Sequence, residues 1–369
     1  MSWAWLCWDC PSTAKLDLWQ IEVMQKKKGT IFVGTSGGVD SSVAAALLKR
    51  AGFNVVGVYM KCWSAELSPS CTATDDERMA RLAVSHLGIP FYVWNFIDEY
   101  KKRVVDYMIE GYRNGITPNP DMMCNKEIKF GLFFDKAMAL GADYVATGHY
   151  SRIKDDKIYA GKDTNKDQSY FLAFIKPEVL DKVLFPIGNY TKPEVREMAR
   201  KFGLPNAERK DSQGICFVGE VNVVDFLRQY IKPKKGEIVD THGKVWGSHE
   251  GVMYYTIGQR QGIGLAEGPW YVVSKDIENN RLVVSRNEED LKWNEATVRN
   301  INWLSKPDTF PADLMVHLRY RHEGAKAKVE DMGNGTYRLQ FATSQRAVTP
   351  GQFAAFYCGE ELLGGGVIA

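Results

Sequence analysis

A glycine- and serine-rich turn, GTSGGVDSS at residues 34–42, separates two apolar stretches near the start of the chain. The stretch before it, residues 30–33, is short and apolar, as is typical of a buried strand. The stretch after it, residues 41–50, carries alanines and leucines on one side and is predicted to be a helix. A turn of this kind between a strand and a helix favours an α/β fold.

The composition of the turn is suited to binding phosphate. Gly37 and Gly38 let the backbone approach a ligand and turn its N–H groups inward, and the following helix N-terminus adds positive potential. The serines supply hydroxyl donors, and Asp40 either anchors the turn or helps to hold Mg²⁺. A plain capped turn is the alternative, because Gly and Ser also begin helices. The turn lacks both the GxxxxGK[ST] and the GxGxxG patterns.

Strands and helices alternate beyond this turn. Strands are expected at residues 54–59, 91–94 and 144–147, and helices at residues 75–87, 98–113 and 125–140. Such alternation predicts a doubly wound parallel sheet with helices on both faces. We assign residues 29–221 to this α/β domain.

The periodicity changes after about residue 221. Residues 226–231 are predicted to be helical, and short strands separated by Gly, Asn and Asp follow, with a hairpin turn at Asn279 and Asn280. Residues 222–292 are therefore assigned to a small central α+β domain. Residues 293–369 are nearly all short strands, which predicts a C-terminal β-barrel.

The composition is that of an ordinary globular protein with available thiols. Lys and Arg number 47 and Asp and Glu 45, so the net charge of +2 neither favours nor excludes a nucleic-acid partner. Seven scattered cysteines indicate a reducing compartment rather than a disulfide scaffold. Since no apolar run is long enough to span a membrane and no signal-peptide pattern is present, we expect a cytoplasmic protein with no membrane partner.

Residues 1–28 differ in composition from the rest and are interpreted as a poorly ordered N-terminal extension. Cys7 and Cys10 have the CxxC spacing of half a zinc site, but the sequence has no second CxxC to complete it. A start of translation at Met24 is a further interpretation.

A stiff segment precedes the first cysteine of interest. In PNPDMMCNKEIKF, residues 118–130, two prolines hold the backbone extended. Asp121 is expected to cap the following helix, which places Cys124 in its first turn. A helix N-terminus favours the thiolate, whereas the nearby carboxylate opposes it unless its task is to move a proton. The alternative is a buried structural cysteine.

A second cysteine lies in the string DSQGICF at residues 211–217. Gly214, within a polar loop, provides a hinge just ahead of Cys216. Arg209 and Lys210 are expected to favour the thiolate of Cys216. A core cysteine between two apolar neighbours is the alternative.

The string SGGVDSS is similar to the PP-loop of the ATP pyrophosphatases, which cleave ATP between its α- and β-phosphates and adenylate a substrate oxygen. Together with NPDxxCNxxIKF and DSxGICF, it resembles the tRNA-specific 2-thiouridylase family (MnmA/TrmU) over residues 29–369. The resemblance implies a PP-loop catalytic domain, a central domain that contacts tRNA, and a C-terminal barrel. It implies ATP contacts at Gly34, Thr35, Ser36, Gly37, Gly38, Val39, Asp40, Ser41, Met60 and Gly148.

The same resemblance implies the chemistry. ATP, with Mg²⁺, adenylates the C2 oxygen of the wobble uridine of tRNA for Lys, Glu or Gln. Cys216 carries a persulfide received from a cysteine desulfurase or a sulfur relay protein. Cys124 either releases sulfide from Cys216 or resolves the persulfide, leaving a Cys124–Cys216 disulfide, and Asp121 acts as acid and base. An iron–sulfur cluster held by Asp121, Cys124 and Cys216 is the alternative that the family leaves open.

The resemblance also implies where tRNA is held. The flipped target base would lie against Asn119, Pro120 and Asp121. The remaining implied tRNA contacts are His149, Asp167, Gln168, Ser169, Arg319, Tyr320 and Gln352. For the exposed members of this set, a solvated surface is the alternative.

Two other functions compete with this hypothesis. An amide-forming PP-loop ligase would need a carboxylate pocket and no reactive thiols. A non-catalytic RNA-binding protein would bind tRNA without making pyrophosphate, and the intact SGGVDSS string argues against it.

Overall fold

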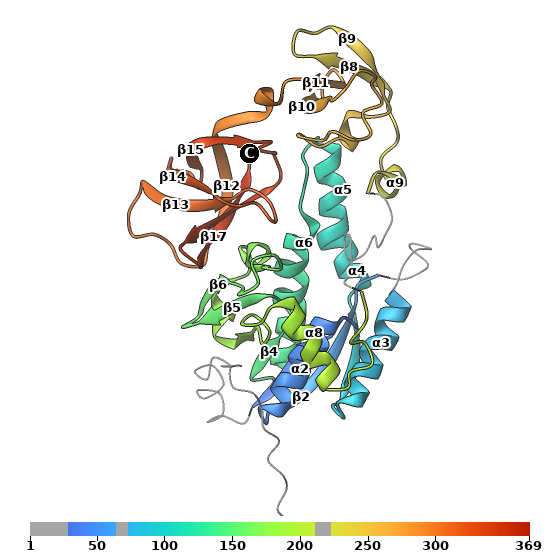
Figure 1. Cartoon of the computed structure of the whole chain (residues 1–369), viewed down its shortest axis with the longest axis vertical. Coiled ribbons are helices and arrows are strands. Elements are labelled where there is room, and N and C mark those ends of the chain that lie inside the picture. Colours follow the sequence, from blue (N-terminus) through green and yellow to red (C-terminus); the bar gives the residue numbers. More distant parts are fainter. Residues whose placement is uncertain (1–28, 64–72, 211–222) are drawn as a thin grey trace, which may run out of the picture.

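The computed structural model describes residues 29–63, 73–210 and 223–369. Figure 1 shows three parts within these residues: an α/β domain with a parallel sheet, a small sheet beyond the far end of helix α5 (Asp106–Arg113), and a C-terminal β-barrel. The predicted fold class is confirmed. The expected extension at residues 1–28 lies outside the described residues.

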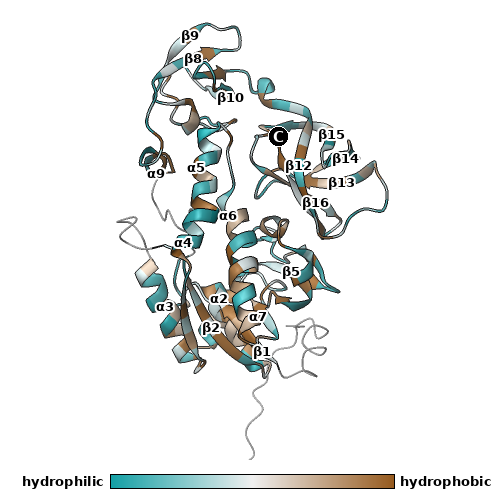
Figure 2. Cartoon of the chain, turned by 180° about the vertical axis from the view of Figure 1, so that it is seen from behind, coloured by the Kyte–Doolittle hydropathy of each residue, from teal (hydrophilic) through white to brown (hydrophobic). Residues whose placement is uncertain are grey.

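The α/β domain is built on a five-stranded sheet in the order β3-β2-β1-β4-β7, with every pair of neighbours parallel. Its strands are β1 (Thr30–Gly34), β2 (Asn54–Lys61), β3 (Phe91–Asn95), β4 (Tyr144–Ala146) and β7 (Val183–Leu184). Figure 2 shows the strands as predominantly hydrophobic, as expected of a sheet covered on both faces. Four of these strands were predicted, and β7 was not.

Side chains of β1 alternate between two cores. Ile31 and Val33 pack in the cluster that includes residues of α2, whereas Phe32 belongs to the large cluster on the other face. Helices α2 (Val39–Arg50) and α3 (Ala73–His86) lie on the first face, and α8 (Lys192–Lys201) packs on α2. Placing β1 in the middle of the sheet puts its following turn at the carboxyl edge, where open parallel sheets bind ligands.

Two long helical segments cover the second face. One runs through α4 (Ile97–Tyr100), η1 (Lys101–Val105) and α5, and the other through α6 (Pro120–Met123), η2 (Cys124–Phe133) and α7 (Phe134–Ala139). The predicted helices at residues 98–113 and 125–140 are confirmed, but η1 and η2 are π-helical, which periodicity did not predict. Two short 3-10 helices, η3 (Ser169–Leu172) and η4 (Pro177–Lys182), precede β7.

The central part contains α9 (Val223–Arg228), η5 (Val252–Tyr254) and a four-stranded sheet in the order β10-β11-β8-β9. Its strands are β8 (Gly236–Asp240), β9 (Val245–His249), β10 (Tyr271–Asp276) and β11 (Arg281–Ser285). Strands β10 and β11 are antiparallel, and Asn280 lies between them with a left-handed φ of 53°. The predicted hairpin at Asn279 and Asn280 is confirmed.

The C-terminal part closes into a barrel of six antiparallel strands, because β12 pairs with both β15 and β17. After η6 (Glu288–Leu291), its strands are β12 (Lys292–Trp303), β13 (Ala312–His317), β14 (Ala325–Asp331), β15 (Tyr337–Arg346), β16 (Phe353–Cys358) and β17 (Glu361–Ile368). A hairpin of β5 (Ser151–Lys154) and β6 (Lys157–Ala160), from the α/β part of the sequence, pairs with β17. Among the described helices, none is both long and apolar enough to cross a membrane.

Candidate active site

The glycine-rich turn forms a cradle between β1 and α2. Gly37 has a φ of 77°, and a side chain there would collide with the carbonyl oxygen of Asp76 on α3. Gly38 is the N-cap of α2, and its first-turn N–H groups receive no side-chain cap from the described residues. A left-handed glycine followed by uncapped helical N–H groups makes a concave donor surface suited to an anion.

Hydroxyl groups complete this cradle. The Ser36 and Ser41 hydroxyls lie 3.3 Å apart, and Ser41 Oγ accepts from Ser36 N at 3.1 Å. Ser42 Oγ donates to Gly38 O at 3.0 Å. The hydroxyl of Thr35 is buried and has no hydrogen-bond partner among the described residues. An orphaned hydroxyl beside a donor-rich turn fits the binding of a polyphosphate.

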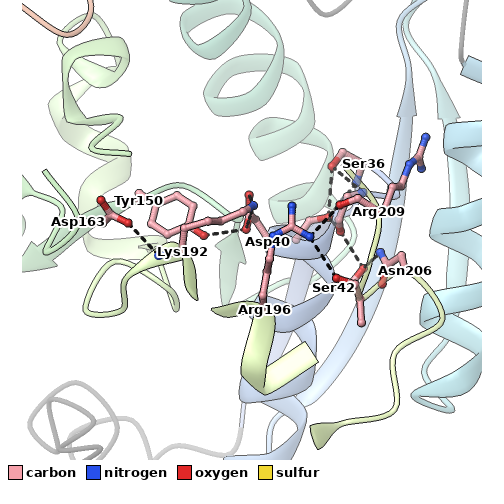
Figure 3. A network of polar contacts seen from close by, with 12 residues as sticks. Ser36, Asp40, Ser42, Tyr150, Asp163, Lys192, Arg196, Asn206 and Arg209 are labelled. Atoms are coloured by element: carbon pink, nitrogen blue, oxygen red, sulfur yellow. Dashed lines mark hydrogen bonds and ion pairs between the residues drawn. The ribbon is translucent and has the colours of Figure 1, made fainter. Parts of the chain in front are cut away.

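Asp40, in the first turn of α2, is held by two partners (Figure 3). Lys192 Nζ donates to its two carboxylate oxygens at 2.8 and 2.9 Å, and Tyr150 Oη donates to Oδ1 at 2.8 Å. Lys192 is only 8% exposed, so its charge is matched by this carboxylate. Sequence reasoning missed Lys192, although the TKPE string at residues 191–194 has the capping-box pattern that begins α8.

Two further side chains reach the cradle from residues after α8. Asn206 Nδ2 and Arg209 Nη1 donate to Gly37 O at 2.9 and 3.2 Å, and Arg209 also pairs with Asp76 (Figure 3). The expectation that Arg209 serves the thiolate of Cys216 stays a prediction, because Cys216 lies outside the described residues. Nothing in the local sequence pattern indicated that Asn206 contacts the turn.

The other predicted ATP contacts lie at the same edge of the sheet. Met60, near the end of β2, packs closely on Gly34. A Cβ atom added to Gly34 would lie 3.0 Å from Cε of Met60. Gly148, just after β4, lies against the start of α2: a Cβ atom on it would be 2.6 Å from Ser41 N. The structure therefore gathers the predicted nucleotide residues around one turn.

The cap of α6 differs from the prediction. Asn119, not Asp121, is the N-cap: its side chain accepts from Met122 N at 3.1 Å, and Pro120 occupies the first turn. The prediction was wrong because a proline after an Asx residue shifts the start of the helix by two positions. Cys124 is then the first residue of η2, beyond the first turn, and is 6% exposed. The helix terminus consequently favours its thiolate less than expected.

Two partly buried charged residues of this helical segment, Asp121 and Lys129, lie near the buried Thr147 and His149. Burial raises the pKa of Asp121, and the positive charge of Lys129 partly opposes that shift. Lys129 Nζ lies 3.4 Å from Nε2 of His149, and Thr147 Oγ1 lies 2.7 Å from Nδ1 of the same ring. Burial and Lys129 together hold the pKa of His149 well below its usual range, so the imidazole is neutral. Burial therefore makes Asp121 easier to protonate than a carboxyl in water, with Lys129 opposing that effect, and it keeps His149 uncharged.

The predicted tRNA contacts in residues 167–169 form an internal hydrogen-bonded turn. Asp167 accepts from Gly161 N at 2.8 Å and from Ser169 Oγ at 2.9 Å, while burial raises its pKa. The Ser169 side chain is fully buried and also bonds Tyr357 Oη at 2.9 Å. Gln168 Oε1 accepts from Tyr150 N at 3.0 Å, which brings this turn next to His149.

The barrel residues lie across the seam from this turn. Tyr320 packs on Phe171 with ring centroids 4.7 Å apart. The exposed Arg319 donates to Arg346 O at 3.3 Å. Gln352 Nε2 donates to Thr117 O at 2.9 Å, two residues before the N-cap Asn119. The seam between barrel and α/β domain therefore ends at the segment that leads to Asp121.

The cysteine pair is only partly described. Cys216, and with it the expected Cys124–Cys216 disulfide, lies outside the described residues. Within the described ranges, no group of three or more His, Cys, Asp and Glu side chains is placed to hold a metal ion.

Comparisons with known proteins agree over nearly the whole chain. Three family models match in succession: the tRNA methyl transferase HUP domain at residues 29–220, the tRNA methyl transferase PRC-barrel domain at 224–286, and the aminomethyltransferase beta-barrel domain at 293–368. The tRNA-specific 2-thiouridylase MnmA 1 of Geobacillus kaustophilus is 48% identical over 93% of this chain and 96% of its own. The tRNA-specific 2-thiouridylase MnmA of Akkermansia muciniphila is 48% identical over 91% and 97%.

Proposed function

The chain belongs to the tRNA-specific 2-thiouridylase family, and from this premise we propose that it is an ATP-dependent sulfurtransferase that replaces the C2 oxygen of the wobble uridine of tRNA with sulfur. The observation that carries the proposal is the short path from the cradle to the helix of Asp121 and Cys124. Gly148 packs against Ser41 at the start of α2, and the next residue, His149, lies 3.4 Å from Nζ of Lys129 on η2, the continuation of that helix. This proximity supports a single site that combines the nucleotide cradle with the cysteine-bearing helix.

The cradle supports the first step. A urea-like carbonyl oxygen is a poor leaving group, and its attack on the α-phosphorus of ATP releases pyrophosphate and turns it into a phosphate ester that leaves readily. The N–H groups at Gly38 and the start of α2 are placed to bind the departing phosphates. Asp40 is the carboxylate available to share a Mg²⁺ ion with the phosphates, since Mg²⁺ is commonly bound by one or two carboxylates plus phosphate oxygens. Its release from Lys192 would accompany that binding.

The two cysteines support the second step. Attack of the Cys124 thiolate on the sulfur of the Cys216 persulfide forms a Cys124–Cys216 disulfide and releases hydrosulfide. Hydrosulfide then adds to C2 and the C2–O bond breaks, so AMP leaves. In the other order, the terminal persulfide sulfur attacks C2 first and Cys124 then releases it. Both routes require a thiol reductant to restore the cysteines, and in both Asp121 is the group that holds or moves the proton.

The sulfur source and an iron–sulfur alternative belong to the same proposal. The persulfide on Cys216 would come from a cysteine desulfurase or a sulfur relay protein. A cluster held by Asp121, Cys124 and Cys216 would replace the persulfide. Asp121 and Cys124 lie on one continuous helix, three residues apart, which is compatible with either use.

The decisive experiment mixes the purified protein with ATP, Mg²⁺, a persulfide or sulfide source and unmodified tRNA, and measures 2-thiouridine in the digested nucleosides. Pyrophosphate is expected to form in step with 2-thiouridine. With the persulfide source, Cys124→Ser and Cys216→Ser should each abolish thiolation, whereas Cys358→Ser, which removes an exposed barrel thiol, should not. Pyrophosphate release without any 2-thiouridine, unchanged in both serine variants, would instead favour an amide-forming ligase, and tRNA binding without pyrophosphate would favour a non-catalytic binding protein.

The iron question needs a parallel arm. The same reaction is run without oxygen, with the protein reconstituted with iron and sulfide or treated with a chelator. The persulfide route predicts equal rates in both preparations, whereas a cluster predicts activity only in the reconstituted one.

A further inference from the structure

The peptide bond between Gly37 and Gly38 is held by two side-chain hydrogen bonds to its carbonyl oxygen. Its carbonyl oxygen accepts from Asn206 Nδ2 at 2.9 Å and from Arg209 Nη1 at 3.2 Å (Figure 3). In a trans peptide the carbonyl and the following N–H point in opposite directions. The N–H of Gly38 therefore points away from Asn206 and Arg209, and it faces the exposed Ser36 at a long 3.4 Å to Oγ.

The side that the Gly38 N–H faces is the open side of the cradle. Gly38 is the N-cap of the twelve-residue helix α2, whose first N–H groups receive no side-chain cap from the described residues. Gly37 has a φ of 77°, which turns successive N–H groups toward a common point. The two hydrogen bonds to the Gly37 carbonyl oxygen therefore fix the direction of the Gly38 N–H, the donor that an incoming phosphate would meet.

The side chains of Asn206 and Arg209 are themselves held in place by further hydrogen bonds. Asn206 is 1% exposed and donates a second hydrogen bond to Ser42 Oγ at 2.9 Å. Arg209 spans Gly37 O and the Asp76 carboxylate, and its own carbonyl accepts from Arg196 Nη1 at 2.9 Å. A carbonyl that accepts two N–H donors is polarised, which makes the N–H of the same amide a stronger donor.

We propose that Asn206 and Arg209 are positioning residues for the phosphates of the nucleotide. They never touch the phosphates themselves: they lock the Gly37–Gly38 peptide in the orientation that offers the Gly38 N–H to the anion. A bond flanked by two glycines otherwise rotates easily, because neither residue has a Cβ to restrict it. The inference rests on the proposed nucleotide site but does not require that tRNA be the substrate.

The test removes the two side-chain donors to Gly37 O. Asn206→Asp puts an acceptor oxygen against Gly37 O, and Arg209→Gln removes the charged fork that reaches both Gly37 and Asp76. Equilibrium binding of ATP and pyrophosphate is measured by calorimetry without tRNA or a sulfur source. Each variant should lose about tenfold in affinity for both, the equivalent of one lost hydrogen bond to a charged group. The KM for ATP should rise with it, while the KM for tRNA stays unchanged.

Adenosine and an exposed control separate positioning from a general structural role. Adenosine has no phosphates, so its affinity should not change in either variant. Arg200→Ala, which breaks an exposed pair with Glu208 on the same segment, should bind ATP like the unaltered chain. Thermal melting without nucleotide identifies any variant that has failed to fold, and the other variant then decides.

Equal losses for ATP and adenosine, or unchanged ATP affinity in the folded variants, would overturn the inference. Its failure is distinguishable from failure of the proposed function. A chain that binds ATP in an Asn206-dependent way yet makes no 2-thiouridine would contradict the thiolation proposal and still support the positioning role of Asn206.

Discussion

Asp121 and His149 are both affected by one cation, Lys129, which lowers the pKa of each. The charge lowers the pKa of the carboxyl against the effect of burial, and it lowers the pKa of the imidazole together with burial. The prediction of Asp121 as a functional carboxyl came from its place before Cys124. Its environment could not be predicted, because His149 reaches Lys129 from a strand end 20 residues away.

Replacing Lys129 with Met is predicted to shift the pH dependence of thiolation. Without the cation, the pKa of Asp121 should rise further. If Asp121 must be ionised to accept a proton, activity is lost as pH falls through its pKa, so the acidic limb should move to higher pH. Single-turnover rates between about pH 5 and 9 measure the limb.

Lys126→Met is the matched control for that shift. Lys126 is on the same helix but is partly exposed and pairs with Glu127. Its removal should leave the acidic limb in place. A Lys129→Met profile that superimposes on the control would show that Asp121 is not the titrating group.

The secondary-structure elements around the nucleotide turn were predicted in part: β1 and α2 were predicted, and α8 was not. Strand β1 and helix α2 follow from an apolar run and an alanine-rich face on either side of the glycines. Helix α8 was missed although its capping box is visible in the sequence: Thr191 N donates to Glu194 at 2.6 Å. The π-helical segments could not be predicted, because one extra residue in a turn leaves the apolar spacing almost unchanged.

Contact between the end of β4 and the start of α2 is predicted to be essential for nucleotide use. A Cβ atom on Gly148 would lie 2.6 Å from Ser41 N and 2.8 Å from the carbonyl carbon of Asp40, so Gly148→Ala must displace the helix N-terminus. We expect a rise of about tenfold in the KM for ATP and a loss of about 1–3 kcal/mol in the free energy of unfolding. Steady-state kinetics and denaturant titration measure the two.

Gly141→Ala separates the two effects. Gly141 has a φ of 83°, but a Cβ atom on it would meet nothing within 4 Å. Its replacement should cost about 1–2 kcal/mol through backbone strain alone and leave the KM for ATP unchanged. If both variants raised the KM equally, loss of stability rather than the β4–α2 contact would explain it.

Across the whole molecule, local sequence patterns do not predict which distant segments pair with each other. The β5–β6 hairpin lies within the α/β part of the sequence, yet its Ile158 pairs with Leu362 of the barrel. The strand character of such residues follows from alternation, but the identity of the partner depends on surfaces formed only after folding. The same holds for Thr117, an ordinary residue of the α/β part that contacts both of the other two parts.

Thr117 joins the three parts through separate atoms. Its N–H donates to Pro350 O at 2.9 Å, and its carbonyl accepts from Gln352 at 2.9 Å, both in the barrel. Its hydroxyl lies 3.3 Å from Thr256 Oγ1 in the central part. Two residues later Asn119 caps α6, the helix that carries Asp121. Parts of the molecule expected to hold tRNA are thus tied to the position of Asp121, the proposed acid–base group.

Thr256→Val tests whether that tie matters for catalysis. The change keeps the shape of the side chain and removes one hydrogen bond to Thr117, at a stability cost of about 1 kcal/mol. Because misplacement of a reacting group lowers the rate even where binding is retained, kcat for thiolation should fall severalfold while the KM for ATP is unchanged. Thr241→Val, at an exposed turn of the central part, should leave kcat as it is. A Thr256→Val enzyme with normal kcat would mean that the Thr117–Thr256 contact does not set the position of Asp121.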